Sequence, residues 1–537
     1  MTTVEIYSRF YVVTNGIELL WYHKDVNKSL LEGLMGDKYM ITLFEYISSA
    51  VVDGELPGDF SLPDLTDDEN ELKWADGALD GVTMYHMAIP EISKEDRVLI
   101  SDAVRAASKR DYDLADSLFK MLGKHLQAII VIDDLQAYIV DNQRQLNAKN
   151  LFEYAIHLLF ESDNRECLKF GLSLLELFKT NDKNELKKVI RTIGLSEEFA
   201  LFAICVMLKW ENGNDEIWEL AKKLHGWGRI HAIERLEPDS EEIRKWMLME
   251  GIHNNVMPAY SALACWTKSN AEDILRNGPS REEFKVIGEI IYGLLDEGPV
   301  PGISKIQNSD EILSVYLETA GTMELTPDDY EVIDEILGYV EEEYSDKCPI
   351  ALECKRLMHT YHARCLMLDA VKQGRCLELA IDSGIDIKPY VYDLMNSSIE
   401  GNYHMCRYLM HDDEYRNKTM ELYRRELPLE EMKTQPTKTL GLGREYWRQS
   451  AVEFLLQELR DHCFEGQDFV AVGLQSAPVR TRNVSLNVLE SWVQAEQKPL
   501  SELLPDMWEL LLTLNEIEPD DKVSIRMKKL LSGSIKF

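Results

Sequence analysis

Positive charge is scarce in this sequence of 537 residues. Lys and Arg total 58 against 94 Asp and Glu, which leaves a formal net charge of −36. A nucleic-acid binder neutralises phosphates with clustered basic side chains, and an acidic surface is repelled by anionic lipid headgroups. The composition therefore argues against nucleic-acid and membrane partners. It favours a protein or peptide partner that presents a basic or mixed surface.

Long hydrophobic runs are also missing. The longest uninterrupted apolar stretch, FALFAICVML at 199–208, has ten residues, whereas about 20 are needed to span a bilayer. The opening MTTVEIYSRF has no basic stretch that leads into an apolar run, so no secretory signal is expected. The nine cysteines are scattered without paired spacing, which is typical of reduced cysteines in a cytosolic protein. We predict a cytoplasmic location.

Recognisable catalytic motifs are absent from the sequence. It contains no Gly-x-Ser-x-Gly elbow, no Walker loop and no His-Glu-x-x-His zinc motif. Gly441-Leu442-Gly443 is too short a glycine pattern to cradle a phosphate. We therefore predict no metal and no cofactor. Because catalytic residues can be scattered over a fold, an enzyme stays open as the alternative.

What the sequence does contain is helical periodicity from about residue 92 onward. In residues 167–178, Leu168, Leu172, Leu175 and Phe178 line one stripe of a helix. A longer stripe covers 350–368, and 199–208 is apolar all round, as expected of a helix between neighbours. Short Gly, Asn and Asp breaks between such stripes indicate antiparallel helical hairpins. The predicted fold is mainly α, a solenoid of stacked hairpins of the HEAT or armadillo kind.

The first 91 residues have a different pattern. Residues 4–13 are rich in β-branched and aromatic residues and end at an Asn-Gly turn, after which 17–22 could return as a second strand. Residues 54–71 form an acidic, proline-containing loop, and GVTMYHMAI at 81–89 is another strand-like run. We predict a small mixed α/β cap over 1–91.

A basic segment interrupts the acidic chain between residues 416 and 448. It has eight basic against five acidic residues, and it includes MKTQPTKTLGLG at 432–443, which has no helical pattern. The predicted organisation is therefore a repeat array at 92–431, a linker or hinge at 432–443 and further helical repeats at 444–537. Arg424, Arg425 and Arg444 are candidate partner-binding residues. The simpler interpretation is a solvated face.

Two segments resemble HEAT-type repeats: GWGRIHAIERL at 226–236 and SAPVRTRNVSLNVLESW at 476–492. In that family a basic residue near the start of the second helix precedes small and aliphatic positions that pack on the next repeat. The resemblance places Arg229 and Arg480 at that basic position.

The whole chain, with WYH at 21–23 and GWGRIHAIERL, is also similar to a group of large acidic bacterial proteins, some of which are labelled limonene hydroxylases. That resemblance implies a monooxygenase, which needs a flavin, a haem or a non-haem iron to handle oxygen. The sequence has no GxGxxG after a strand and no clear His pair with a carboxylate at ligand spacing.

The most suggestive cluster lies in residues 227–235. Trp227, His231, Glu234 and Arg235 have offsets of four, seven and eight, which place them on one side of a helix. A Trp shelf beside a His and an ion pair could hold a ligand. The alternative is structural: His231 and Arg235 would bond loop carbonyls or nearby acids. The asparagines at 254–255 are interpreted as a helix cap.

Weaker candidates complete the set. His359 and His362 could share a metal with Cys365, but three positions on one helix converge poorly. The acidic residues of the 54–71 loop could attract Ca²⁺, although the EF-hand pattern is missing. Other candidates are aromatic anchors of the array, residues at the junction of cap and array, and the loop acids. They are Trp210, Trp218, Trp246 and Trp266; Trp21, His23, Tyr85 and His86; and Asp64, Asp67, Asp68, Glu69 and Glu71.

Together these observations favour a non-catalytic cytosolic scaffold or adaptor that binds a protein or peptide on a helical-repeat surface. The alternative is an enzyme, a cofactor-dependent hydroxylase by resemblance, with its site where the cap meets the first repeats.

Overall fold

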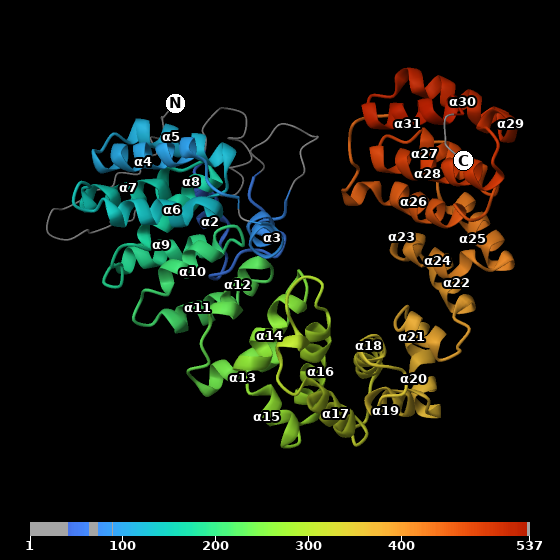
Figure 1. Cartoon of the computed structure of the whole chain (residues 1–537), viewed down its shortest axis with the longest axis horizontal. Helices are drawn as coiled ribbons and strands as arrows, with labels where there is room; N and C mark the ends of the chain where they lie inside the picture. The colour runs from blue at the N-terminus through green and yellow to red at the C-terminus, as the bar shows by residue number, and fades with distance from the viewer. Residues whose placement is uncertain (1–40, 64–73, 89, 534–537) are drawn as a thin grey trace, which may run out of the picture. The chain divides into compact units, whose positions relative to one another are not determined.

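The computed structural model describes residues 41–63, 74–88 and 90–533 (Figure 1). These residues are almost entirely helices and short connections, and among them the only β pairing is an isolated bridge between Val52 and Glu55. The prediction of a mainly α protein is confirmed. Within the same ranges, none of the helices combines the length and the apolar character that a membrane crossing requires.

The strand predicted at 81–89 is wrong. Helix α3 (Ala78–His86) covers most of it and starts at Gly77, whose φ of +76° is in the left-handed region that glycine tolerates. Before it lies α2 (Leu43–Ala50), which begins with a capping box between Thr42 and Glu45. The described part of the predicted cap is thus helical. The strands predicted at 4–13 and 17–22 lie outside the described residues.

The chain divides into two compact units at Met323 and Glu324. The boundaries at 91 and 431 stay predictions. The further helices of the first unit are α4 Lys94–Ser108, α5 Tyr112–His125, α6 Ala128–Asp141, α7 Ala148–Glu161, α8 Arg165–Leu175, α9 Asn184–Gly194, α10 Ala200–Met207, α11 Gly213–Ala221, α12 Trp227–Arg235, α13 Glu241–Glu250, α14 Ala259–Lys268, α15 Ala271–Arg276, α16 Arg281–Leu295, η1 Ile303–Lys305 and α17 Ser309–Ala320.

The second unit, from Glu324 onward, is likewise helical. Its elements are α18 Pro327–Glu343, α19 Pro349–Met358, α20 Tyr361–Val371, α21 Leu377–Asp382, α22 Lys388–Ser397, α23 Ile399–Asn402, η2 Tyr403–Cys406, α24 Arg407–Met410, α25 Asp413–Glu426, η3 Arg444–Tyr446, α26 Trp447–Leu459, α27 Gln467–Leu474, α28 Val479–Glu496, α29 Leu500–Leu503, α30 Pro505–Ile517 and α31 Asp521–Leu531.

Helices that follow one another in sequence pack against one another in the first unit. The closest partners are α4 with α5, α7 with α8, and α14 with α16. As predicted for 199–208, α10 is enclosed: seven of its eight residues are buried, and its neighbours are α8, α9, α11 and α12. Apolar side chains on every side of α10 are removed from water when the protein folds. This burial is the main contribution to the stability of such a segment. From here on, the array means helices α4–α16, which are the first part of the repeat array predicted at 92–431.

Two segments of the second unit differ in detail from their predictions. The stripe over 350–368 belongs to two helices, because Thr360 caps α20: the Ala363 N–H donates to Thr360 Oγ1 at 3.1 Å. Residues 432–443 contain no helix, as predicted. They are tied to the start of α28 by Thr437 N to Ala477 O at 3.1 Å and Val479 N to Thr439 O at 2.9 Å. This connector therefore lies inside the second unit.

Candidate functional site

Helix α3 brings together two sets of residues that the sequence leaves separate. Tyr85 lies over the side of α12 that carries Trp227 and His231, with ring centroids 5.8 Å and 6.2 Å away, stacked at 28° and 6°. From α14, the Tyr260 ring lies 5.0 Å from Tyr85 and 4.8 Å from Trp227. His86 Nε2 lies 2.5 Å from Tyr260 Oη. The predicted aromatic face of α12 is therefore an interface with α3.

Glu234 is the charged centre of this interface. Its carboxylate accepts a hydrogen bond from the Tyr85 hydroxyl and forms an ion pair with Arg235 at 3.2 Å. Burial favours the neutral acid, but the neighbouring His231, the hydrogen bond from Tyr85 and the charge of Arg235 outweigh it and lower the pKa of Glu234. Burial and the Glu234 charge raise the pKa of Tyr85, which stays a neutral donor. The Glu234 carboxylate is therefore held by the Tyr85 phenol and is not presented to solvent as a general base.

Burial shows that this face is closed. Trp227 is 7 % exposed and His231 is 2 % exposed. Burial lowers the pKa of His231, so the ring is neutral at physiological pH. Its Nδ1 lies 4.0 Å from Glu234, too far for a hydrogen bond. The structural alternative holds for Arg235, which donates to the His231 carbonyl at 3.1 Å.

Arg229 connects loops. Its guanidinium is buried and donates to the carbonyls of Ala221 and Leu224 at 2.9 and 3.2 Å, and to Glu250 O at 2.6 Å. It thereby ties the turn before α12 to the end of α13. Such a residue holds successive helices together, and its side chain is buried away from any external partner.

In the second HEAT-like segment the same role belongs to Arg482, not to Arg480. Arg482 donates to the carbonyls of Ser476 and Thr437 and forms a bidentate pair with Glu518, both bonds being 2.8 Å. Arg480 instead pairs with Glu453 at 3.3 Å and is partly exposed.

A second cluster, which the sequence did not indicate, lies at the N-terminal end of α3. Lys169 of α8 is 2 % exposed and forms ion pairs with Asp80 at 2.7 Å, Glu198 at 2.7 Å and Glu166 at 2.9 Å. Nearby, Arg165 pairs with Asp76 at 2.9 Å and lies 3.6 Å from Glu198. We call these six side chains the Lys169 cluster.

Protonation in the Lys169 cluster is uneven. Burial raises the pKa of Asp80 to about 6, and Glu166 and Glu198 add to the shift while Lys169 opposes it. Burial also raises the pKa of Asp76. Glu198 shifts the other way because Lys169, the Gly77 N–H and Arg165 stabilise its charge, which lowers its pKa despite burial. Asp80 is therefore the least stabilised charge of the cluster.

In the Lys169 cluster, the carboxylates that exceed the cations come from residues 74–88, which precede the array. The array contributes two cations, Arg165 and Lys169, and two carboxylates, Glu166 and Glu198. Asp76 and Asp80 add two further carboxylates from residues 74–88. Docking of α3 therefore turns a balanced set into one with four acids for two bases.

Close packing fixes the register of α3. A Cβ atom at Gly81 would lie 2.2 Å from Cε3 of Trp227, which no side chain tolerates without displacement. Thr83 Oγ1, two residues on, lies 2.8 Å from Gln127 Oε1. Glycine at position 81 is what lets α3 approach the indole.

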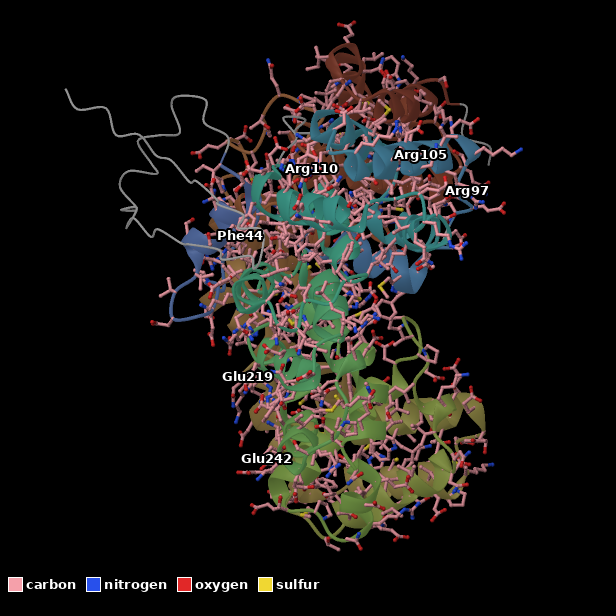
Figure 2. All side chains as sticks on the ribbon, turned by 90° about the vertical axis from the view of Figure 1, so that its left-hand side faces the viewer. Phe44, Arg97, Arg105, Arg110, Glu219 and Glu242 are labelled. Atoms are coloured by element: carbon pink, nitrogen blue, oxygen red, sulfur yellow. The ribbon has the colours of Figure 1, made fainter. Side chains whose placement is uncertain are left out.

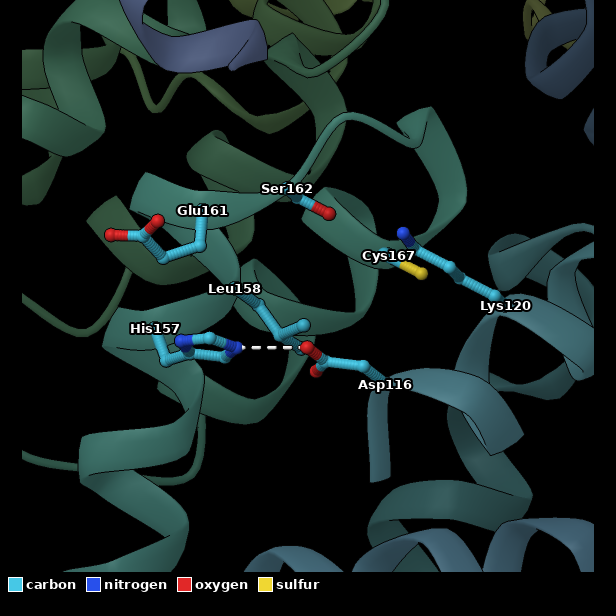
Figure 3. Close-up of a pocket in the computed structure, with 7 residues that line it drawn as sticks. All are labelled: Asp116, Lys120, His157, Leu158, Glu161, Ser162 and Cys167. Atoms are coloured by element: carbon cyan, nitrogen blue, oxygen red, sulfur yellow. Dashed lines mark hydrogen bonds and ion pairs between the residues drawn. The ribbon is translucent and has the colours of Figure 1, made fainter. Parts of the chain in front are cut away.

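A small polar cavity lies apart from α3, between α5, α7 and α8 (Figure 3). Its volume is about 20 Å³, room for about one water molecule. His157 Nε2 lies 3.0 Å from Asp116, and Tyr154 donates to the same carboxylate at 2.8 Å. Burial raises the pKa of the Cys167 thiol in this cavity to about 12. Cys167 is therefore a thiol at neutral pH and not a nucleophile.

The basic candidates of the second unit form separate contacts. Arg424 makes a bidentate pair with Asp468 at 2.7 and 3.0 Å. Arg425 donates to Glu426 and to Asn396, both at 2.7 Å. Arg444 is exposed in η3. The two arginines of α25 thus already have acceptors within the unit.

The remaining candidates are placed as follows. His359 precedes α20, whereas His362 and Cys365 lie on it, and within the described ranges no three His, Cys, Asp or Glu side chains could hold a metal. Asn254 caps the turn before α14, with Val256 N and Met257 N at 2.9 and 2.8 Å from its Oδ1. Trp210 and Trp266 are buried, and cations lie over the rings of Trp218 and Trp246.

Several predicted residues lie outside the described ranges. They are Trp21, His23, Asp64, Asp67, Asp68, Glu69 and Glu71. Comparison with family models, with curated proteins and with solved structures gives no match. The function is therefore argued from the residues of the chain itself.

Proposed function

We propose that the protein is a non-catalytic scaffold or adaptor of the cytosol that binds a protein or peptide partner on a surface of stacked helices. The proposed architecture is an α-solenoid of the HEAT or armadillo kind. The proposed partner surface is basic or mixed in charge. The observation that carries the proposal is the way the array holds the described parts of its own preceding segment, residues 41–63 and 74–88.

That segment runs across helices that are far apart in sequence. Leu43 N donates to Ser162 O at 2.9 Å at the end of α7. Arg165 of α8 donates to the Leu62 carbonyl at 3.3 Å, and Lys223, after α11, donates to the Gly54 carbonyl at 3.0 Å. Further along, α3 lies on α12 and α14. Side chains of successive helices that grip the backbone of one crossing segment are what a peptide-binding solenoid uses.

The solenoid proposal rests on two features. Helices pack mainly on their near neighbours in sequence, as expected when each hairpin buries its apolar stripe on the next. Arg229 and Arg482 each join a turn to a later segment through backbone carbonyls or a carboxylate. Such repeated loop-to-loop links support stacked hairpins.

The charge of the partner is inferred from an acidic stretch. Residues 306–346 contain 13 acids and no Lys, Arg or His. Within it, burial and the neighbouring carboxylates of Asp382, Glu335, Glu331 and Glu341 raise the pKa of Asp334 on α18 to about 6. Unbalanced negative charge of this kind favours a partner that brings basic side chains.

The test places a photoreactive amino acid at Glu342, an exposed residue of α18, in the full-length protein within cells of its source. A protein that crosslinks there is purified and titrated calorimetrically against the wild type and against the Glu342→Lys, Glu343→Lys double variant. We expect the double variant to bind roughly tenfold more weakly and the wild-type affinity to fall with added salt.

The matched control is Glu219→Lys, Glu242→Lys. Glu219 and Glu242 are exposed acids on α11 and α13. Both lie near one edge of the first unit in Figure 2. An affinity that does not change with added salt and is equal for the two double variants would overturn the proposed partner charge. The absence of any crosslinked protein would overturn the scaffold itself.

The second candidate is an enzyme, in line with the hydroxylase resemblance. Tyr85, His86, His231 and Glu234 gather titratable groups of the segment and the array within one interface. Elemental analysis and a visible absorption spectrum of freshly purified protein separate the two candidates. Stoichiometric iron, haem or flavin would favour the hydroxylase.

A further inference from the structure

Helix α3 depends on the array for its conformation. It has nine residues, and its Gly77 N-cap supplies no side-chain hydrogen bond. Isolated helices shorter than about 12 residues are marginal in water. The contacts of α3 with α8, α12 and α14 therefore create the helix, as they do when a peptide folds in a groove.

Three positions of α3 are recognised in three different ways. The Asp80 carboxylate meets Lys169 of α8. Gly81 lies against the Trp227 indole of α12. Tyr85, four residues later and so on the same face, stacks on Trp227 and donates to Glu234. The surface formed by these side chains of α8, α12 and α14 is called the α3 groove below.

One of these contacts is poorly matched. Asp80 is 3 % exposed, and its Oδ1 accepts no hydrogen bond from another described residue. Lys169 already has Glu166 and Glu198 as partners within the array. A helix with a neutral residue at this position would leave the array's own charges balanced.

We propose that α3 is a built-in, displaceable occupant of the α3 groove, and that the external ligand is a protein helix with an uncharged residue, then glycine, then tyrosine four residues after the glycine. This rests on the proposed function, because it names the element of the partner that the scaffold holds. The glycine fits against Trp227, the tyrosine reaches Glu234, and the uncharged residue avoids the acids around Lys169.

Competition between α3 and the external helix depends on pH. The charged groups around Asp80 are Glu166, Lys169 and Arg165 of α8, Glu198 ahead of α10, and Asp76 of its own segment. Because burial raises the pKa of Asp80 from 3.8 to about 6, the docked helix takes up a proton as pH falls. Docking of α3 should tighten by roughly tenfold between pH 7 and pH 5. An external helix without the acid competes best at neutral pH.

The experiment uses the full-length protein and fluorescent peptides with the sequence of residues 74–88. Gly81→Val in the protein drives α3 off Trp227 and opens the groove, whereas Gly58→Val is the matched control at a glycine with open space around it. One peptide has the native sequence, a second carries D80N, and a third carries D80N with G81V. Binding is measured by fluorescence anisotropy at pH 7.

We expect the D80N peptide to bind the Gly81→Val protein at least about tenfold more tightly than the native peptide does. It should bind the Gly58→Val and wild-type proteins at least tenfold more weakly, because α3 fills their groove. The third peptide should not bind. Equal binding of the native and D80N peptides, equal binding to open and closed proteins, or no binding to the open protein would each overturn the inference.

The open variant is first compared with Gly58→Val by circular dichroism and thermal melting. If Gly81→Val does not fold, Tyr85→Ala replaces it, because it loosens α3 by removing contacts without inserting atoms, and the same outcomes apply. A protein that fails this test but binds its crosslinked partner through α18 keeps the proposed function and loses only the α3 groove as its site.

Discussion

Lys169 in the first unit and Arg482 in the second are both buried cations, but their surroundings differ. Arg482 meets one carboxylate, Glu518, and both side chains are 0 % exposed. Its other donors bond the carbonyls of Ser476, Ala477 and Thr437. Lys169 instead meets three carboxylates within 2.9 Å. One carboxylate balances the charge of Arg482, whereas Lys169 is surrounded by more carboxylates than its single charge can balance.

The difference separates a permanent joint from an adjustable one. A buried ion pair with complete hydrogen bonding stabilises the fold only while both members are present. Loss of one member leaves the other as a buried charge without a partner. A cluster with spare acid can respond by taking up a proton, and Asp80 is ready to do so near pH 6. Arg482 therefore holds the connector at 432–443 against α28, whereas the Lys169 cluster sets how firmly α3 is docked.

Removal of Arg482 should have the largest effect. Arg482→Ala leaves Glu518 buried without its partner and should lower the free energy of unfolding of the second unit by about 4 kcal/mol. Urea unfolding followed by tryptophan fluorescence measures it. The control is Arg424→Ala, which breaks a similar bidentate pair at the surface, 43 % exposed on both sides. It should cost at most about 1 kcal/mol, and equal losses would contradict the distinction.

Removal of Lys169 should come next. Lys169→Met leaves three carboxylates together and should destabilise the first unit by about 3 kcal/mol at pH 7. The loss should shrink at pH 5, because the acids of the cluster then take up protons. Lys188→Met, at an exposed i,i+3 pair with Glu185, serves as the control. Unfolding at both pH values tests this, and a loss independent of pH would argue against spare acid.

Neutralising Asp80 should stabilise the protein. The pKa of Asp80 is raised by folding, so its charge opposes docking above about pH 6, and this penalty disappears as pH falls toward 3.8. Asp80→Asn should therefore add about 1–2 kcal/mol at pH 7 and little at pH 4. Asp59→Asn, at an exposed acid of the same segment, should do neither. Destabilisation by Asp80→Asn at pH 7 would show that its pairing with Lys169 dominates.

The smallest effect is expected at the aromatic end of α3. Tyr85→Phe keeps the ring on Trp227 and removes the hydrogen bond to Glu234, at a cost of about 1 kcal/mol. Tyr112→Phe, at a tyrosine whose ring packs on Tyr154 away from α3, is the matched control. Thermal melting of the two variants measures the difference. A loss at Tyr85 as large as that at Lys169 would move the main anchor of α3 to its aromatic end.

Helical periodicity was sufficient for the long elements, because burial of an apolar stripe dominates their formation. It failed at 81–89, where β-branched and aromatic residues suggested a strand. There the helix arises from contacts of Gly81 and Tyr85 with a residue far along the chain, and such tertiary contacts override local propensity. The mixed cap was predicted from this run together with the strands expected at 4–13 and 17–22, which lie outside the described residues.

The candidate site was predicted in part. Offsets along α12 correctly placed Trp227, His231 and Glu234 on one face, and Tyr85 and His86 were singled out separately. Their meeting was not visible, because Tyr85 and Glu234 are 149 positions apart. The Lys169 cluster was missed, although a signal existed. Lys169 is the one charge in the otherwise apolar and small run at 167–175, and a buried cation needs acids around it.

The most direct test of the central claim is hydrogen exchange of α3 in the wild type and in Asp80→Asn at pH 7 and pH 5, corrected for intrinsic rates. If α3 is a separately docked helix with spare acid beneath it, its amides should exchange faster than those of α12 and be roughly tenfold better protected at pH 5 than at pH 7. Asp80→Asn should remove the pH dependence. Protection of α3 equal to that of α12 at both pH values, in both proteins, would contradict the account.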